Sequence, residues 1–463
     1  MSGNDSGLRA SVEKMRAEGV SEPAIATFSE LYGRLVAGDT GLVPEAEIEP
    51  VERLPDADEL EPVEDVRAIL DQAIVLRLNG GLGTSMGLAG PKSLLEVRDG
   101  LTFLDIVARQ VLALRERTGA RLPLVLMNSF STREPSLERL ARYPQLAADV
   151  PLDFVQHKEP KLRADDLRPV SWPADPALEW APPGHGDLYP ALVSSGMLDA
   201  LLERGYRWAF VANVDNLGAT LDPRILAWIA REEIPFLMEV ADRTPADRKG
   251  GHLARRRADG GLVLREIAQT PEADLDAFQD VERHRYFNTN NLWLDLRALA
   301  AELRRRDGIL PLPMIVNRKT VDPRDPESPA VIQLETAMGA AIGVVPGAAA
   351  LRVPRRRFAP VKTTNDLLAL RSDAYAVSDA FEVGLAPGRS GPPVIDLDDR
   401  YYKRLADFEA RFADGAPSLV GCDELTVEGD VAFGARVVVR GRVRVAQEGP
   451  QARRIPDGAV LEG

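Results

Sequence analysis

The sequence predicts an α/β protein with a mixed, mostly parallel sheet, followed by a parallel β-helix at the C-terminus. Between residues 73 and 240, short apolar runs alternate with segments of helical spacing, which is typical of a sheet with helices on both faces. Near the C-terminus, apolar residues recur every six positions, which is typical of a β-helix. With 463 residues and 45% hydrophobic content, the chain is long enough for two or three domains.

Residues 1–70 precede this alternation and divide into a helical and an acidic part. Apolar residues repeat at intervals of three and four over the first 40 residues, which predicts helices. Residues 45–65 hold ten carboxylates and only one arginine, Arg53, together with three prolines. Such a composition predicts an extended surface linker.

The main domain, predicted over residues 71–375, contains apolar runs of strand length. They cover residues 73–78, 122–127, 152–156, 207–214 and 234–240. Several runs end in polar residues, namely Asn79, Asn128, Gln156, and Asn213 with Asp215. Ligands of open α/β sheets bind outside the carboxyl ends of the strands, so we expect these side chains to share one site.

The stretch from Leu76 to Ser93 reads LRLNGGLGTSMGLAGPKS and joins a strand end to a glycine-rich loop. Exposed backbone N–H groups in such a loop suit phosphate oxygens, and Lys92 adds a full positive charge. The dinucleotide fingerprint does not fit, because Met86 stands where its third glycine should be. The P-loop does not fit either, because Pro91 separates Gly90 from Lys92. A flexible glycine turn is the alternative interpretation.

Further along the chain, four short motifs carry polar groups. His185 lies between glycines and suits contact with a phosphate or a sugar hydroxyl, although a solvent-facing turn is the alternative. Clustered amides over residues 288–291 suit sugar hydroxyls. Residues 331–342 are predicted to place Gln333 and Glu335 at the head of a helix. Lys362 precedes Thr and Asn residues that can cap a helix, so it would lie at a positive helix N-terminus.

Composition excludes several classes of function. The formal net charge of −14 argues against a nucleic-acid partner or an anionic membrane surface. Cys422 is the only cysteine, so neither an intrachain disulfide nor a zinc cluster built on thiolates can form. No signal peptide or long apolar run is present, and we expect a cytoplasmic protein. No Ser-His-Asp set is legible, whereas Asp215 suits Mg²⁺ together with phosphate oxygens.

The C-terminal segment, predicted as a β-helix over residues 421–463, follows a connecting segment over residues 376–420. Its pattern contains two apolar series with a period of six, and each series predicts one inward-facing position of a repeated turn. The series are Leu425, Val431, Val437 and Val443, and Val427, Phe433, Val439 and Val445.

Ten short motifs together resemble the eukaryotic-type UTP–glucose-1-phosphate uridylyltransferase family, in the same order over residues 70–462. They are LNGGLGTSMG, GPKS, VLMNSF, PPGHGD, NVDNLGAT, KGG, EIAQ, FNTNNLW, VIQLETA and PVKTTNDL. The resemblance implies a nucleotidyltransferase-type, Rossmann-like catalytic domain and a left-handed β-helix. It also implies that UTP and glucose 1-phosphate are converted to UDP-glucose and pyrophosphate, reversibly and with Mg²⁺.

The same resemblance assigns roles to individual residues. It places Lys92 and Lys362 as the catalytic charges on the phosphates and Asp215 as the metal ligand. The uridine contacts are Leu78, Asn79, Gly80 and Gly81, with Met127, Gln156 and Gly184 around the uracil. The glucosyl phosphate is lined by His185, Asn213, Gly251, Glu266 and Asn290.

The sequence differs from the family pattern at two points, and three other functions are alternatives to this interpretation. Ala89 stands where family members commonly carry a lysine, and the chain ends at Gly463 without a further strand-forming tail. We therefore expect a monomer or dimer rather than an octamer. The rivals are a broad UDP-sugar or UDP-N-acetylhexosamine pyrophosphorylase, a UTP-binding protein without catalysis, and a hexapeptide acyltransferase.

Overall fold

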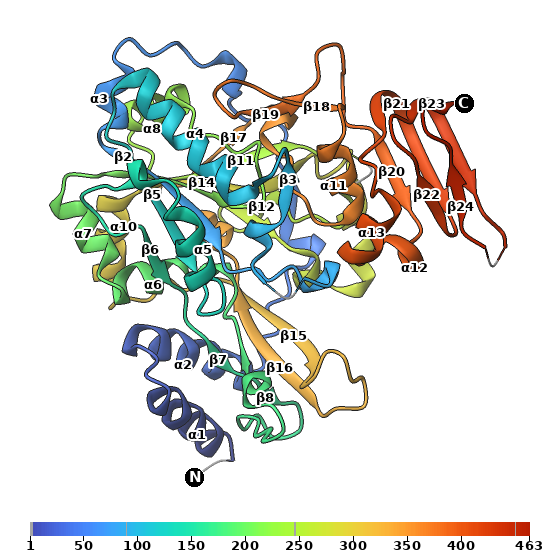
Figure 1. The fold of residues 1–463 in the computed structure, drawn as a ribbon. Helices are drawn as coiled ribbons and strands as arrows, with labels where there is room; N and C mark the ends of the chain where they lie inside the picture. The colour runs from blue at the N-terminus through green and yellow to red at the C-terminus, as the bar shows by residue number, and fades with distance from the viewer. Residues whose placement is uncertain (1–2, 89, 245–246, 450) are drawn as a thin grey trace.

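A ten-stranded sheet forms the centre of the protein in this computed structural model, which describes residues 3–88, 90–244, 247–449 and 451–463 (Figure 1). Ala89 lies outside the described residues. Six strands of the sheet point in one direction: β2 (Ala73–Asn79), β5 (Leu124–Asn128), β6 (Asp153–Val155), β10 (Trp208–Asn213), β11 (Phe236–Asp242) and β17 (Ala349–Arg352). Strand β14 (Tyr286–Asp295) runs against them, between β10 and β11. The predicted mixed α/β fold with a mostly parallel sheet is confirmed.

Helices cover both faces of this sheet, and β2 shows why its apolar run is unbroken. Ala73 and Val75 pack into one core cluster, while Ile74 and Leu76 pack into another on the opposite face. A strand buried on both faces needs apolar residues at successive positions. The first face carries α4 (Phe103–Thr118) and α8 (Pro223–Arg231), and the second carries α6 (Leu188–Ser194), α7 (Met197–Glu203) and α10 (Leu296–Arg305).

The acidic segment differs from the extended linker that its composition predicts. Its strand β1 (Ile48–Pro50) pairs with β12 (His252–Arg256), which in turn pairs with β13 (Leu262–Arg265), both antiparallel. Ile48 and Ala57 are buried. Arginines distant in the sequence neutralise the carboxylates and so hold the segment in place; the pairs include Glu45 with Arg265, Asp56 with Arg352, and Asp58 with Arg356.

The N-terminal helices α1 (Gly3–Ala17) and α2 (Glu22–Val36) confirm the helical spacing and pack beside a small separate sheet (Figure 1). That sheet contains β8 (Leu162–Arg163), β15 (Met314–Thr320) and β16 (Ala330–Thr336). The helix predicted over residues 331–342 is therefore wrong. Gln333 and Glu335 lie on β16, because its alternate residues Ile332 and Leu334 pack against the helices, and a 3-10 helix follows at Met338–Gly343.

The C-terminal strands lie at one end of the molecule, beyond α11 (Thr364–Arg371), and each pairing among their described residues is parallel (Figure 1). Leu425 lies beside Val443 and Val427 beside Val445, a register of three six-residue units. All eight residues of the two apolar series are buried, as is Cys422. The strands are β20 (Val394–Leu397), β21 (Ser418–Glu428), β22 (Val431–Phe433), β23 (Val438–Ala446), β24 (Arg453–Ile455) and β25 (Val460–Glu462).

The remaining elements are short and connect these parts. Among the described residues, no helix has both the length and the apolar character that crossing a membrane requires. The other helices are α3 (Val66–Leu70), α5 (Arg133–Leu140), α9 (Leu275–Gln279), α11 (Thr364–Arg371), α12 (Asp399–Tyr402) and α13 (Leu405–Arg411). The other strands are β3 (Glu96–Arg98), β4 (Leu101–Thr102), β7 (Glu159–Pro160), β9 (Trp180–Ala181), β18 (Tyr375–Val377) and β19 (Val383–Leu385).

Candidate active site

The carboxyl ends of the parallel strands bring several predicted residues together. Leu78 of β2 lies between Asn213 of β10 and Met127 of β5. One step further, Asn79 lies beside Asn128, whose backbone carbonyl accepts a hydrogen bond from the Gln156 N–H at 2.8 Å. The expected shared edge therefore exists, and the glycine-rich loop begins on it.

Neutral amides fix the start of that loop. The Asn79 side-chain Nδ2 donates to Asn128 Oδ1 and to Ser136 Oγ, at 2.7 Å each. A Cβ atom on Gly80 would lie 2.6 Å from the Gln156 Oε1 atom, so any larger residue would displace the Gln156 amide from its present position. The Gly81 surface is open, and its carbonyl accepts the Lys92 N–H at 3.0 Å. The loop thus holds its backbone close to Gln156 and to Lys92.

Lys92 and Asp215 form an ion pair at the far end of the loop. The Lys92 Nζ atom lies 2.5 Å from Asp215 Oδ2, and the two side chains are 16% and 17% exposed. No group of three or more His, Cys, Asp or Glu side chains within the described ranges could hold a metal ion. Asp215 provides a single carboxylate, a type of ligand that Mg²⁺ prefers. Phosphate oxygens and waters would have to supply the other ligands of the ion.

The Gly184–His185 turn faces the small sheet. Gly184 has a φ of 78°, and a Cβ atom there would collide with the backbone of Thr336. The Met338 N–H donates to His185 Nδ1 at 2.9 Å. Burial lowers the pKa of His185 to about 4, so the ring is neutral at neutral pH. Its proton must then be on Nε2, which makes that atom a hydrogen-bond donor.

Glu266, Gly251 and Lys362 gather at the antiparallel part of the sheet. A Cβ atom on Gly251 would collide with the Glu266 carboxylate, so the glycine makes room for that side chain. Burial raises the pKa of Glu266, and the nearby positive charge of Lys362 offsets part of the increase. Lys362 itself is exposed and directly precedes Thr363, the capping residue of α11.

A bulge in β14 orients Asn290. The register between β11 and β14 shifts by two residues there, and Asn290 has a φ of 58°. The Asn290 N–H donates to Asn288 Oδ1 at 2.9 Å, and Asn288 Nδ2 donates to Asn290 Oδ1 at 2.8 Å. Bulges re-aim side chains at the edges of sites, and the amide cluster belongs to strand β14.

Three predicted residues differ in how much of them a ligand can reach. The Met127 side chain is 1% exposed and packs in the core, and the Asn79 amide is also buried. A ligand can meet these two residues only through the backbone or after rearrangement. Lys362, in contrast, presents its side chain to solvent.

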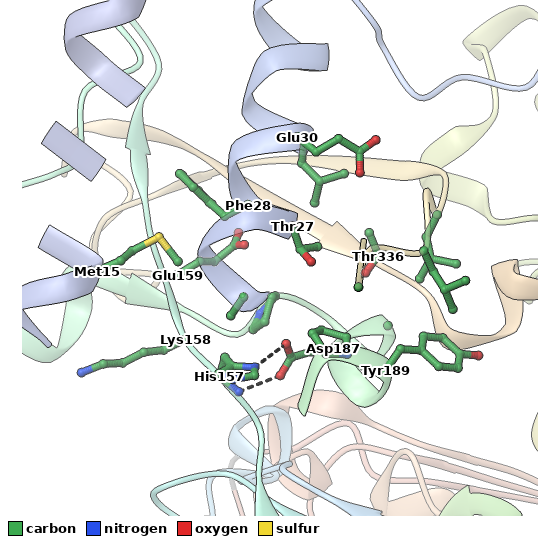
Figure 2. Close-up of a pocket in the computed structure, with 18 residues that line it drawn as sticks. Met15, Thr27, Phe28, Glu30, His157, Lys158, Glu159, Asp187, Tyr189 and Thr336 are labelled. Carbon is green, nitrogen blue, oxygen red and sulfur yellow. Dashed lines mark hydrogen bonds and ion pairs between the residues drawn. The ribbon is translucent and has the colours of Figure 1, made fainter. Parts of the chain in front are cut away.

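Sequence reasoning missed a contact between His157 and Asp187 (Figure 2). Asp187 Oδ2 accepts the His157 backbone N–H at 2.6 Å, and Oδ1 lies 2.8 Å from His157 Nδ1. The residues are 30 positions apart, and no motif links them. They border a narrow cavity of about 30 Å³ against α2, which has room for a few waters at most and for no nucleotide.

His157 also contacts two serines, so the structure contains a Ser-His-Asp arrangement that was not legible in the sequence. His157 Nε2 lies 2.8 Å from Ser21 Oγ and 2.9 Å from Ser194 Oγ. The N–H groups of Ser195 and Gly196, which follow the exposed Ser194, already donate to helix carbonyls. These two N–H groups are therefore not available to an oxyanion, and the His157 contacts connect Ser21, at the start of α2, to Ser194 of α6.

Sequence reasoning also missed a buried ionic network beneath the site. Glu239 is fully buried, and its carboxylate accepts hydrogen bonds from the Arg357 guanidinium at 2.6 and 2.8 Å. Trp293 Nε1 and Asn291 Nδ2 donate to the same carboxylate, at 2.9 and 3.0 Å. Arg357 lies in an arginine run that has no motif of its own, so its burial could not be read from the sequence.

Comparison with known proteins places this chain in a family. The family model described as UTP–glucose-1-phosphate uridylyltransferase matches residues 25–440. The chain belongs to this family. Among curated members, the enzyme of Solanum tuberosum is 41% identical over 453 residues, which cover 96% of this chain and 92% of the relative. The enzyme of Saccharomyces cerevisiae is 42% identical, with 85% and 77% covered.

Solved structures of UDP-glucose pyrophosphorylases share the fold. A mutant of the Leishmania major enzyme in complex with UDP-glucose superimposes with a TM-score of 0.93 and 48% identity, covering 98% of each chain. The Trypanosoma brucei protein, described as a UDP-glucose phosphorylase, also gives a TM-score of 0.93 at 48% identity, with 99% of this chain and 98% of that chain covered. The likeness therefore extends from the central sheet to the C-terminal strands.

Proposed function

We propose that this protein transfers the uridylyl group of UTP to glucose 1-phosphate, giving UDP-glucose and pyrophosphate. The observation that carries the proposal is the Lys92–Asp215 pair at the carboxyl edge of the parallel strands, where the glycine loop ends. Family membership supports the same reaction, because curated relatives bear the name of this activity.

The uridine is bound where the glycine-rich loop begins, by residues that carry no charge. Leu78, Asn79, Gly80 and Gly81 present backbone to the nucleoside, and their fixed geometry favours this role. Gln156, Gly184 and the backbone of Met127 surround the uracil, with Gln156 offering the paired donor and acceptor that a base edge needs.

The glucosyl phosphate is bound by residues from the Gly184–His185 turn, the end of β10 and the antiparallel part of the sheet. His185 contributes a neutral Nε2–H donor, and Asn213, Gly251, Glu266 and Asn290 supply donors and acceptors for sugar hydroxyls. Lys362 approaches from the start of α11, where the positive end of the helix adds to its charge.

Charge neutralisation and positioning carry the chemistry. A phosphate oxygen of glucose 1-phosphate forms a bond to the α-phosphorus of UTP, the bond from that phosphorus to the β-phosphate oxygen breaks in line, and pyrophosphate leaves. Lys92 and Lys362 stabilise the charge that develops on the phosphates. Asp215 would hold Mg²⁺, which supplies further neutralisation of the phosphate oxygens.

We also propose the finer organisation of the chain. The C-terminal strands would form a left-handed parallel β-helix over residues 421–463, preceded by a connecting segment (376–420), the catalytic domain (71–375) and the N-terminal segment (1–70). The parallel pairing and the six-residue burial support the β-helix. A monomer or dimer is proposed, and light scattering that gave a stable octamer would refute it. The cytoplasmic location stays a prediction.

The test is Mg²⁺-dependent release of pyrophosphate from UTP with a panel of sugar 1-phosphates. We expect glucose 1-phosphate to be used in preference to galactose and N-acetylglucosamine 1-phosphates. Comparable use of several sugars would make the protein a broad UDP-sugar pyrophosphorylase. Binding of UTP without release of pyrophosphate from any of them would contradict the proposal.

A further inference from the structure

We propose that Asn216 is a positioning residue that clamps the segment carrying Lys362 onto the loop carrying Asp215. The inference rests on the proposed function, because it concerns two charges that would act on the same phosphates. Asn216 follows Asp215 directly and is 1% exposed, so it cannot itself contact a substrate.

One side-chain amide makes three connections. Asn216 Oδ1 accepts the backbone N–H of Ala359 at 2.9 Å, and Nδ2 donates to the backbone carbonyl of Arg357 at 3.2 Å. The same Nδ2 donates to Asn291 Oδ1 on β14 at 3.1 Å. The backbone of Asn216 also forms an isolated antiparallel bridge with Pro360. The Asp215 loop is thereby bonded to Arg357, Ala359 and Pro360, three of the four residues that precede Val361, and to the strand carrying Asn290.

Close packing of the two segments supports the clamp. A Cβ atom on Gly218 would collide with the backbone carbonyl of Arg356, and it would lie 3.1 Å from the Arg357 carbonyl carbon. Arg357 is in turn held by Glu239 and by the Thr220 carbonyl, the latter at 2.9 Å. The base of the Lys362 segment is therefore fixed from both sides.

The Lys362 side chain depends on this base for its position. No ion-pair partner of Lys362 occurs within the part of the chain that the structure describes; its ammonium lies over the Phe358 ring, 5.9 Å from the centroid. Lys92, in contrast, is held by Asp215. Loss of the Asn216 hydrogen bonds would remove no charged side chain. The distance between Lys362 and Asp215 would, however, no longer be fixed. A misplacement of about 1 Å costs on the order of 10² in rate.

Gln110 is a matched control for a purely structural role. Its buried Nε2 donates to the Leu217 carbonyl at 3.1 Å and to the Phe381 carbonyl at 2.9 Å. It thus supports the same loop, next to Asn216, without bonding to residues 357–360. Truncation of either amide removes buried hydrogen bonds, but only Asn216 connects the loop to the Lys362 segment.

The kinetic test compares Asn216→Ala, Gln110→Ala, Lys362→Ala and the double variant of Asn216 and Lys362. We expect Asn216→Ala to lower kcat about 10- to 100-fold with KM for UTP changed less than about threefold, and Gln110→Ala to keep kcat within about threefold. The double variant should be no slower than Lys362→Ala, since Asn216 acts through Lys362. The proposal would be overturned if the fold losses in kcat of the two single variants multiplied in the double variant. An unchanged kcat in Asn216→Ala would overturn it too. Asn216→Ser replaces Asn216→Ala if the latter does not fold.

Hydrogen exchange separates this inference from the proposed function. Exchange of the Ala359 amide should accelerate in the Asn216 variant and stay unchanged in Gln110→Ala, whether or not the protein releases pyrophosphate. An inactive wild-type protein would refute the proposed function, whereas unaltered exchange at Ala359 would refute the clamp.

Discussion

The two sides of the candidate site are held by different chemistry. On the uridine side, neutral amides fix the loops, as in the bonds of Asn79 to Asn128 and Ser136. On the phosphate side, ion pairs between side chains fix the loops. These are the buried pair Glu239–Arg357 and the half-buried pair Lys92–Asp215. This difference agrees with the ligand group proposed for each side. The edge of a base is neutral and can form hydrogen bonds with amides, whereas phosphates need positive charge.

This contrast predicts different costs for substitutions on the two sides. Loss of a neutral hydrogen bond costs about 1–3 kcal/mol, whereas loss of one partner of a buried ion pair costs about 3–5 kcal/mol. Substitutions on the uridine side should therefore change affinity for UTP, and those on the phosphate side should change stability or turnover.

The largest expected effect is on folding. Glu239→Gln removes the carboxylate that is hydrogen-bonded to the buried Arg357 guanidinium and should lower the free energy of unfolding by about 3–5 kcal/mol, measured by urea denaturation. Ser136→Ala, which removes one buried neutral bond to Asn79, is the matched variant and should cost about 1–3 kcal/mol. Equal losses in the two variants would break the contrast.

The next effect is on turnover. Lys362→Ala and Lys92→Ala should each lose about 2.7–4 kcal/mol of transition-state stabilisation, or ~10² to 10³ in kcat, while remaining folded. Pyrophosphate release and circular dichroism measure the two properties. Lys403→Ala, at an exposed lysine outside the site, is the control and should be fully active. Near-normal turnover in either site variant would remove that lysine from the mechanism.

His185 predicts a pH dependence of stability. Burial lowers its pKa from 6.5 to about 4, so the unfolded chain binds more protons between these values. The stability that comes from holding His185 neutral is fully present above about pH 6.5 and is lost as the pH falls towards 4, by up to about 3.4 kcal/mol. Urea unfolding of His185→Asn should show a shallower loss of stability over this window than the wild type. Parallel curves would show that His185 is not held neutral.

The smallest expected effect is on UTP affinity. Asp187→Asn weakens the contacts that hold His157, the neighbour of Gln156, and should raise KM for UTP about tenfold, or about 1.4 kcal/mol, with kcat little changed. Ser194→Ala removes only an exposed hydroxyl from His157 and should leave KM unaltered. If Asp187→Asn lowered kcat instead, the division between an affinity side and a turnover side would not hold.

Local patterns in the sequence predicted the strands, the N-terminal helices and the C-terminal periodicity, because each depends on residues close in the chain. The same holds for the capping of α11, where Thr363 and Asp366 form a reciprocal pair. Prediction failed for residues 331–342, where small and β-branched residues suit either state and pairing with β15 decided for a strand.

The sequence by itself determined the fold class, the glycine loop with Lys92, and the likeness to a family through ordered motifs. Only the tertiary structure decided which side chains hold those motifs in place. The acidic segment docks because arginines such as Arg265 and Arg352 come from distant strands. Asn216 reaches Ala359 and Arg357 across more than 140 residues of chain. Such contacts depend on chain packing, and no local spacing encodes them.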